Sequence, residues 1–379
     1  MKENDTLDYQ LITSDSALQR ICEQARTRKE VALDTEFIRT HTYYPQLGLM
    51  QLYDGENLSL IDPLVIREWQ PFCQLLQDKN VVKFLHAGGE DIEVFLHFFN
   101  QLATPMIDSQ ILAAFTGHNL SCGLATLVKQ YCGVELNKNA SRTDWLMRPL
   151  SEEQCHYAAA DVFHLLPLAK QLVAETVAAG WMEAVEYECL LLVHRRSQIL
   201  DPALAYRKIA RAWQLSIPEL ACLQKLAEWR LNEARERNLA VNFVIREERL
   251  WKVARYRPTS LGELNSLGLS RLEVHSHGKA LLESVAQGNL APEKLLLPLA
   301  TTLFEQHNYK EAFKEIKKKV QLTSLTCGLN SELLASRRQI NQLLKWHWQP
   351  KSTEQLPELI TAWRAELLAS PLQEILKKY

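Results

Sequence analysis

Short apolar runs separated by turn residues dominate the pattern of the first half of the chain. Runs of about four to eight residues, bounded by Gly, Asp or Asn, are typical of strands. Only turn residues separate 47–53 from 58–61, so these two runs and the run before them are expected to form an antiparallel meander. The pattern predicts five strands, at 30–37, 47–53, 58–61, 81–86 and 106–108.

Helical periodicity fills the segments between and after these strands. Ser14 opens a short helix that runs to about Arg26, and Ser151 opens a long helix whose capping box is completed by Gln154. Other helices are expected at 67–78, 90–99, 110–116 and 121–132. A meander followed by strands that alternate with helices predicts an α/β domain with a mixed sheet.

The chain beyond about residue 200 has no convincing strand pattern and is expected to be helical. Segment 214–290 faintly resembles 295–379, because each has a basic helix, a central apolar helix and a similar helix start. This similarity indicates a degenerate repeat of one helical module. Three domains are therefore predicted, at 1–205, 214–292 and 295–379.

Composition narrows the class of protein. Hydrophobic residues make up 47% and charged residues 23% of the chain, which is typical of a folded protein and excludes disorder. No apolar run approaches the ~20 residues of a membrane-spanning helix, and the polar start MKENDTLDYQ is unlike a leader peptide. Eight cysteines without a CxxC pair indicate reduced thiols rather than disulfides or a zinc site. We expect a cytoplasmic protein that contacts no membrane and needs no obligate protein partner.

Charge is distributed unevenly between the two halves. Residues 1–200 contain 26 acidic and 16 basic side chains, a balance of −10, whereas 201–379 contain 19 acidic and 27 basic, a balance of +8. A basic half on a nearly neutral chain indicates a polyanionic partner such as nucleic acid; the alternative is a solvated helical surface.

Four carboxylates and one phenol are the candidate catalytic groups. Asp34 and Glu36 lie two apart in an apolar strand, so both project from one face of the sheet and need a proton or a cation between them. Asp91 follows a Gly-Gly turn near the start of a helix, and Tyr157 precedes Asp161 by one helical turn. The alternatives are an ordinary N-terminal helix acid for Asp91 and a solvated pair for Tyr157 and Asp161.

In this order the residues resemble the three exonuclease motifs of the DEDD superfamily, in its tyrosine-bearing subclass. Longer segments extend the pattern: LDTEFIRTHTYYPQLGLMQLYDG (33–55), IDP (61–63), FLHAGGEDIEVF (84–95), SRTDWLMRPLSEEQCHYAAADVFHLLP (141–167) and VNFVIREERLWKVARYRP (241–258). Over nearly its whole length the chain is similar to the ribonuclease D family. Residues 220–285 match the helicase-and-RNase-D C-terminal (HRDC) module, whereas 295–379 match it weakly.

The resemblance implies an α/β ribonuclease H-like exonuclease domain, with a mixed five-stranded sheet and helices, followed by two all-α HRDC-type domains. It implies a 3′–5′ exoribonuclease that trims structured RNA, notably transfer RNA precursors, and releases nucleoside 5′-monophosphates. It makes Asp34, Glu36, Asp91 and Asp161 metal ligands and Tyr157 the residue that positions the attacking water.

Physical chemistry asks for the same arrangement. A phosphodiester is an anion, so the carboxylates need two divalent cations, ~3.5–4 Å apart, to hold the attacking and leaving oxygens. Oxygen ligands favour Mg²⁺ or Mn²⁺ over zinc. A tyrosine with a reference pKa of ~10 is a poor base near neutral pH, so Tyr157 is better suited to orienting water through a hydrogen bond.

Three residues are candidates for substrate contact. Phe37 is a candidate to stack on the terminal base or to wedge beside it, and the alternative is a core residue. His86 is either a substrate contact or a structural histidine. Arg142 either binds substrate or anchors its loop. In the helical half, four arginines that are expected to be exposed are the candidates for phosphate contact: Arg235, Arg237, Arg246 and Arg255.

Two other functions fit the same residues. A DNA 3′–5′ exonuclease of this fold presents the same metals to the same phosphate, and only contacts to the 2′-hydroxyl distinguish RNA. A non-catalytic protein that binds nucleic acid through its basic half is the third alternative. The complete set of five active-site residues argues against it.

Overall fold

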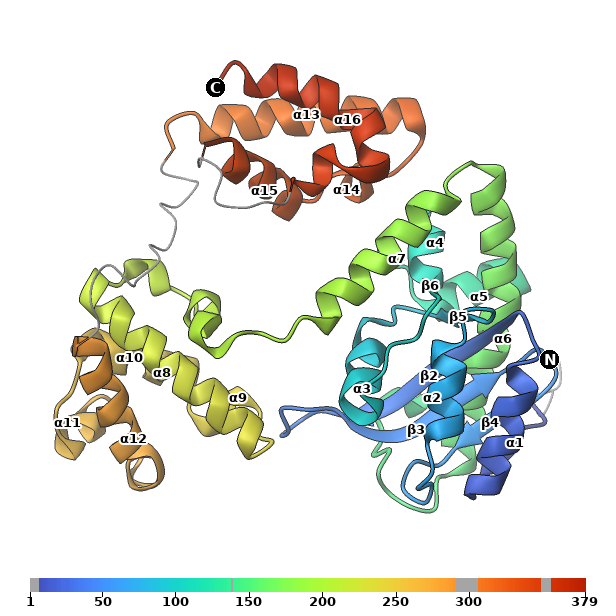
Figure 1. The fold of residues 1–379 in the computed structure, drawn as a ribbon, viewed down its shortest axis with the longest axis horizontal. Coiled ribbons are helices and arrows are strands. Elements are labelled where there is room, and N and C mark those ends of the chain that lie inside the picture. The colour runs from blue at the N-terminus through green and yellow to red at the C-terminus, as the bar shows by residue number, and fades with distance from the viewer. Residues whose placement is uncertain (1–6, 138, 291–305, 349–355) are drawn as a thin grey trace. The chain divides into compact units, whose positions relative to one another are not determined.

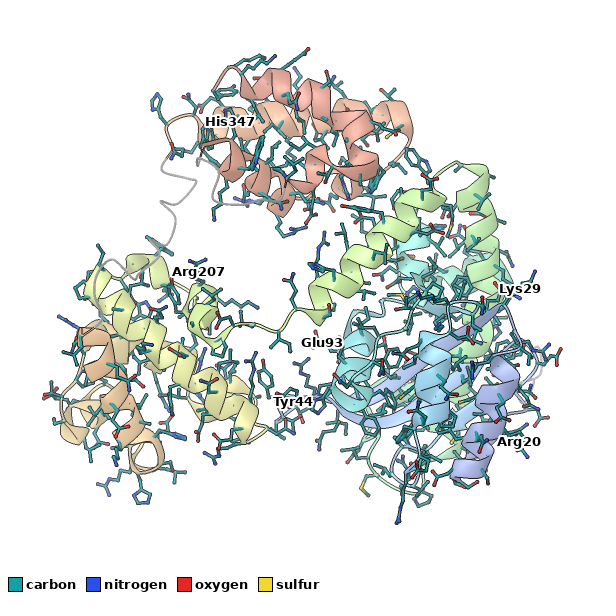
Figure 2. All side chains as sticks on the ribbon, in the orientation of Figure 1. Arg20, Lys29, Tyr44, Glu93, Arg207 and His347 are labelled. Carbon is teal, nitrogen blue, oxygen red and sulfur yellow. The ribbon has the colours of Figure 1, made fainter. Side chains whose placement is uncertain are left out.

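The computed structural model describes residues 7–137, 139–290, 306–348 and 356–379 (Figure 1). The described residues form two compact units. The first unit comprises those in Met1–Ile38, Pro45–Ser197 and His307–Tyr379, and the second those in Arg39–Tyr44 and Gln198–Gln306. Figure 2 shows the side chains on these elements, including Arg20 in the first unit and Arg207 in the second.

The first unit is built on a mixed sheet with the strand order β1-β4-β3-β2-β5-β6. Strands β2, β3 and β4 pair antiparallel, as the meander prediction requires, whereas β5 pairs parallel with β2 and β6 parallel with β5. The strands are β1 (Gln10–Ile12), β2 (Glu30–Ile38), β3 (Gln46–Tyr53), β4 (Leu58–Ile61), β5 (Val82–Leu85) and β6 (Met106–Asp108).

Within the described residues, the sheet has six strands rather than the five expected from the sequence. The additional strand is β1, which pairs parallel with β4 at the edge of the sheet. Only three residues long, β1 is too short to show a readable alternation of apolar and polar positions. Its tertiary pairing, rather than a local pattern, makes it a strand.

Three helices cover one face of the sheet, and the long helix α6 (Glu152–Ala178) covers the other (Figure 1). The three are α1 (Asp15–Ala25), α2 (Gln70–Gln77) and α3 (Gly89–Phe99). Val31 and Leu33 of β2 belong to the core that these three helices share with the sheet. Because side chains alternate along a strand, Asp34, the residue after Leu33, and Glu36, two residues further on, face the opposite side, toward α6.

The β2–β3 pairing contains an irregularity that matters for the site. Glu36 pairs with Leu49 and Phe37 with Leu47, so the register shifts and Gly48 has no partner residue in β2. The remaining helices of this part are α4 (Ser109–Phe115), α5 (Leu124–Cys132) and α7 (Met182–Ser197).

The described residues beyond 200 contain helices and no strand, as expected from the sequence. In the second unit, short 3₁₀ segments precede α8 (Ile217–Glu236), and Leu223 and Leu226 lie in its core. The other helices there are α9 (Val241–Val244), α10 (Glu247–Tyr256), α11 (Leu261–Ser266) and α12 (Arg271–Leu290). The C-terminal helices are α13 (Tyr309–Cys327), α14 (Ser331–Leu334), α15 (Arg337–Trp348) and α16 (Ala362–Leu376). The proposed domain limits at 292 and 295 lie outside the described residues.

Candidate active site

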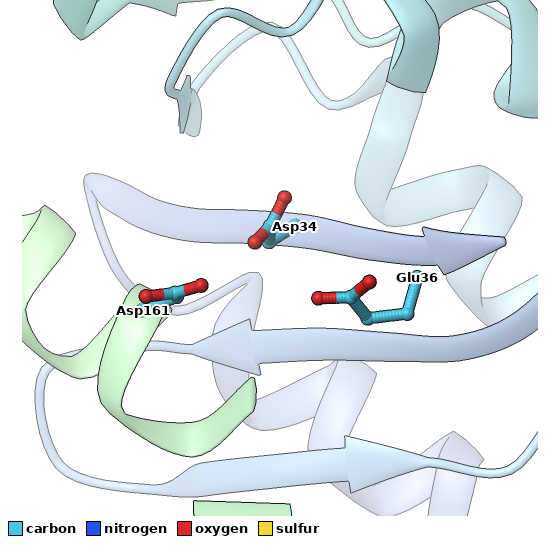
Figure 3. A group of neighbouring side chains, drawn as sticks. All are labelled: Asp34, Glu36 and Asp161. Atoms are coloured by element: carbon cyan, nitrogen blue, oxygen red, sulfur yellow. The ribbon is translucent and has the colours of Figure 1, made fainter. Parts of the chain in front are cut away.

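Three carboxylates from two elements meet between the sheet and α6. Asp34 and Glu36 project from β2, and Asp161 projects toward them from α6 (Figure 3). Each offers one carboxylate oxygen, and these oxygens all lie within 4.8 Å of one another. The structure therefore brings together the strand pair and the helix acid that the sequence separates by more than a hundred residues.

Electrostatics make this cluster unfavourable as a set of bare anions. Burial raises the pKa of Asp34 well above its usual range, and the neighbouring carboxylates Asp91, Glu36 and Asp161 raise it further. Burial, followed by repulsion from Asp161 and Asp91, raises the pKa of Glu36 to about 9. Such groups must hold protons or share a cation. Their oxygen-only donor set fits a hard divalent cation.

Asp91 lies in the first turn of α3, where the helix dipole favours an anion. It is buried and accepts a hydrogen bond from the hydroxyl of Thr35, whose side chain points to the α3 side of β2. Burial raises the pKa of Asp91 to about 6, and the Thr35 hydrogen bond opposes the rise. Asp91 lies outside the group of three oxygens within 4.8 Å, but it repels Asp34 and Glu36.

Thr35 has a role that sequence reasoning missed. Its hydroxyl is the hydrogen-bond donor to Asp91. The signal in the sequence was a polar residue on the side of β2 that Val31 and Leu33 otherwise make apolar, because such a residue needs a buried polar partner.

Tyr157 lies on α6 one turn before Asp161. Burial raises the pKa of its phenol, and the charges of Asp161, Glu36 and Asp34 and a hydrogen bond to Asp161 raise it further. The phenol therefore keeps its proton at neutral pH and acts as a hydrogen-bond donor rather than a base.

The start of α6 is fixed by the capping box expected from the sequence, between Ser151 and Gln154. The Gln154 side-chain amide also donates to the Thr143 hydroxyl (3.0 Å) and the Asp144 carbonyl (3.3 Å). These contacts join the loop before α6 to the first turn of the helix that carries Tyr157 and Asp161.

The three candidate substrate contacts lie in different environments. Phe37 packs against the core shared with α1–α3, which favours the alternative of a core residue. His86 Nδ1 lies 2.8 Å from the Ser109 hydroxyl, and burial lowers the pKa of the imidazole, as suits a structural histidine. Arg142 is exposed at the end of the 3₁₀ helix η1 (Asn139–Arg142), so it remains available to a substrate.

The arginines proposed for phosphate contact are not equally available. Arg235 is half-buried and donates to the Tyr43 hydroxyl and the Leu200 carbonyl, so its predicted exposure is wrong. Arg237, Arg246 and Arg255 are exposed, and two of them, Arg237 and Arg255, form ion pairs with glutamates of α8. A helical surface of mixed charge, rather than an unbroken basic one, surrounds these positions.

Comparison with known families agrees with this geometry. Residues 9–176 match the model described as 3'-5' exonuclease, 219–285 the HRDC domain, and 307–372 the ribonuclease D, C-terminal HRDC domain. The chain is 62% identical to ribonuclease D of Serratia proteamaculans over 98% of this chain and 100% of that protein. The chain belongs to the ribonuclease D family.

Ribonuclease D of Escherichia coli is 55% identical, again over 98% of this chain and 100% of the relative. Its crystal structure, described as that of an exoribonuclease involved in structured RNA processing, matches with a TM-score of 0.95 over the same shares of the two chains. The catalytic core of RRP6 from Trypanosoma brucei shares the fold alone, at 23% identity and a TM-score of 0.62 over 76% of this chain and 81% of that one.

This member of the ribonuclease D family is a 3′–5′ exoribonuclease in which an exonuclease domain precedes HRDC domains. Its exonuclease fold implies the use of divalent metal, and the acidic cluster on β2 and α6 fits that use. Within the described part of the chain, no helix is both long and apolar enough to span a bilayer.

Proposed function

We propose that Asp34, Glu36, Asp91 and Asp161 hold two divalent cations, Mg²⁺ or Mn²⁺, and that Tyr157 orients the attacking water. The observation that carries this proposal is the group of three carboxylate oxygens within 4.8 Å, whose members Asp34 and Glu36 have raised pKa values. Asp34 interacts with all three other carboxylates, which supports a shared position between the two cation sites.

The protein side chains perform distinct tasks in this scheme. When bound, the cations supply the positive charge that attracts the phosphodiester and activates water. The four carboxylates fix those charges at one end of the sheet. The phenol of Tyr157 donates its one O–H to Asp161, so its oxygen is left to accept a hydrogen bond from the water and thereby to select one orientation of it.

We infer that the substrates are RNA 3′ ends, including those of transfer RNA precursors. The excess of basic residues in 201–379 supports attraction of a polyanion larger than a single nucleotide. The involvement of the Escherichia coli relative in structured RNA processing supports the same substrate class. Eight free cysteines support a reducing compartment such as the cytoplasm.

The test is a comparison of RNA and single-stranded DNA of one sequence, each labelled at its 5′ end, with purified protein and Mg²⁺. Progressive shortening of the RNA alone, with release of nucleoside 5′-monophosphates, is the expected result. Equal shortening of the DNA would favour the DNA exonuclease alternative. Repeating the assay with Mn²⁺, and with Mg²⁺ after treatment with a chelator, identifies the cations that support turnover.

A further inference from the structure

The loop between η1 and α6 is attached to the sheet by one arginine. Arg148 donates to both carboxylate oxygens of Asp62, from Nε at 2.7 Å and from Nη2 at 2.6 Å. It also donates from Nη2 to the Gly48 carbonyl at 2.6 Å and from Nη1 to the Trp145 and Met147 carbonyls, each at 2.9 Å. A guanidinium has five N–H groups, and these five bonds use its full donor capacity.

The carboxyl group of Asp62, which accepts from Arg148, is ionised at neutral pH. Burial on its own raises the pKa of Asp62, but the hydrogen bonds from Arg148 and the Leu64 amide outweigh it, so the pKa of Asp62 lies below its usual value. The carboxylate of Asp62 is therefore an anion at neutral pH. Lysine would supply the charge but not the flat, five-donor geometry.

The attachment brings the backbone of Trp145 against the irregular part of β3. A Cβ atom at Gly48 would lie 2.6 Å from the Trp145 carbonyl oxygen and 2.7 Å from the Trp145 Cβ, so only glycine fits there. The indole of Trp145 is buried, with 1% of its surface exposed. Its ring centroid lies 6.1 Å from that of Tyr157.

We propose that Arg148 is a positioning residue for Tyr157: it fixes Trp145 against β3, and the Trp145 indole holds the Tyr157 ring beside Asp161. This inference rests on the proposed role of Tyr157 in orienting water. Arg148 touches none of the four carboxylates in any of its hydrogen bonds, so it acts through the tyrosine and leaves the cation sites intact.

The test uses the full-length protein and the variants Arg148→Lys, Tyr157→Phe and the two combined. We expect Arg148→Lys to lower kcat on a short single-stranded RNA about tenfold, with KM and Mn²⁺ affinity changed by less than about twofold. In the Tyr157→Phe protein the same substitution should lower kcat by less than about twofold, because the hydroxyl it positions is already absent. Arg26→Lys, in the Arg26–Asp78 ion pair, is the matched control and should leave kcat unchanged.

A second variant, Asp62→Asn, tests the same contact if Arg148→Lys fails to fold. It keeps the shape of the partner of Arg148. It should lower kcat as Arg148→Lys does, and the loss should again be less than about twofold in the Tyr157→Phe protein. If Tyr157→Phe lowers kcat and each double variant loses kcat by the product of its two single losses, the positioning role of Arg148 is overturned, while the proposed role of Tyr157 stands. An unchanged kcat in Tyr157→Phe would overturn the proposed role of the tyrosine and the inference that rests on it.

Discussion

At the scale of single residues, the carboxylates of β2 and α6 explain why the site needs cations. The side chain of Asp34 is charged only at the expense of repulsion from Glu36, Asp91 and Asp161. Carboxylates placed this close together lower the stability of the fold unless a bound cation neutralises their charge. The site is therefore organised for binding and catalysis rather than for stability.

Replacing Asp34 by asparagine keeps the shape of the side chain and removes its charge. We expect Asp34→Asn to lower the rate of RNA hydrolysis by at least about 10³-fold, because the shared cation ligand is lost. Affinity for RNA, measured by fluorescence anisotropy, should stay within about threefold. Asp8→Asn, at an exposed position before β1, is the control. Substantial residual turnover in Asp34→Asn would contradict the shared-ligand role.

The raised pKa values also predict how cation binding depends on pH. Glu36 has a pKa of about 9 and Asp91 of about 6 before a cation binds, so binding near neutral pH must displace protons. Affinity for Mn²⁺ should therefore increase as the pH rises from 6 to 8. Calorimetric titrations in two buffers of different ionisation enthalpy should show proton release into the buffer. Titrations that show no proton release would contradict the raised pKa values.

At the scale of elements, β5 is joined to the turns beside it by a buried lysine. Lys83 has no exposed surface, and its ammonium donates to the carbonyls of Asp78, Val81 and Thr104, each at 2.8 Å. These carbonyls belong to the segments that precede β5 and β6. One side chain thus stabilises the turns on which the parallel half of the sheet depends.

Substituting Lys83 by methionine preserves most of its volume and removes the three donors. We expect Lys83→Met to lower the free energy of unfolding by roughly 2–4 kcal/mol, because three carbonyls lose their buried partner. Urea denaturation measures the change, and Lys79→Met, at an exposed position in the adjacent turn, is the control. Equal stability of the two variants would show that water replaces the ammonium.

At the scale of the whole molecule, the acidic and basic halves of the sequence, 1–200 and 201–379, do not coincide with the two compact units. The C-terminal helices belong to the first unit, in which the buried Arg364 of α16 pairs with Glu188 of α7. Trp363 packs against Phe115 and Trp181 in the same unit. Part of the positive charge in 201–379 is therefore structural, so exposed residues of the second unit are the better test of RNA binding.

Three exposed basic residues of the second unit, Lys208, Arg211 and Arg246, provide that test in the full-length protein. Their combined replacement by alanine should weaken binding to a transfer RNA precursor and reduce the slope of log K against log[salt] by about two, at ~0.7–0.9 per lost phosphate contact. The rate on a short single-stranded RNA should not change.

The matched control for this triple variant replaces three exposed basic residues of the first unit: Arg20 and Lys29, which Figure 2 labels, and Lys79. Equal salt slopes for the two triple variants would show that the second unit does not bind RNA through these residues.

The sequence by itself determined the features whose partners are near in the chain. Asp34 and Glu36 share a face because strand side chains alternate, and Tyr157 lies one turn before Asp161 because of the helical repeat. The capping box of Ser151 and Gln154 could be predicted because its two residues lie three positions apart. The family could be predicted because its motifs extend over long continuous segments.

Only the tertiary structure decided the features whose partners are distant in the chain. Arg148 is 86 residues from Asp62 and 100 from Gly48, and no periodic pattern connects positions so far apart. The same holds for strand β1, for the contact of Thr35 with Asp91 and for the packing of the half-buried Phe37 against the core. Backbone geometry sets neighbours within a few residues, whereas packing of the whole sheet against its helices sets the rest.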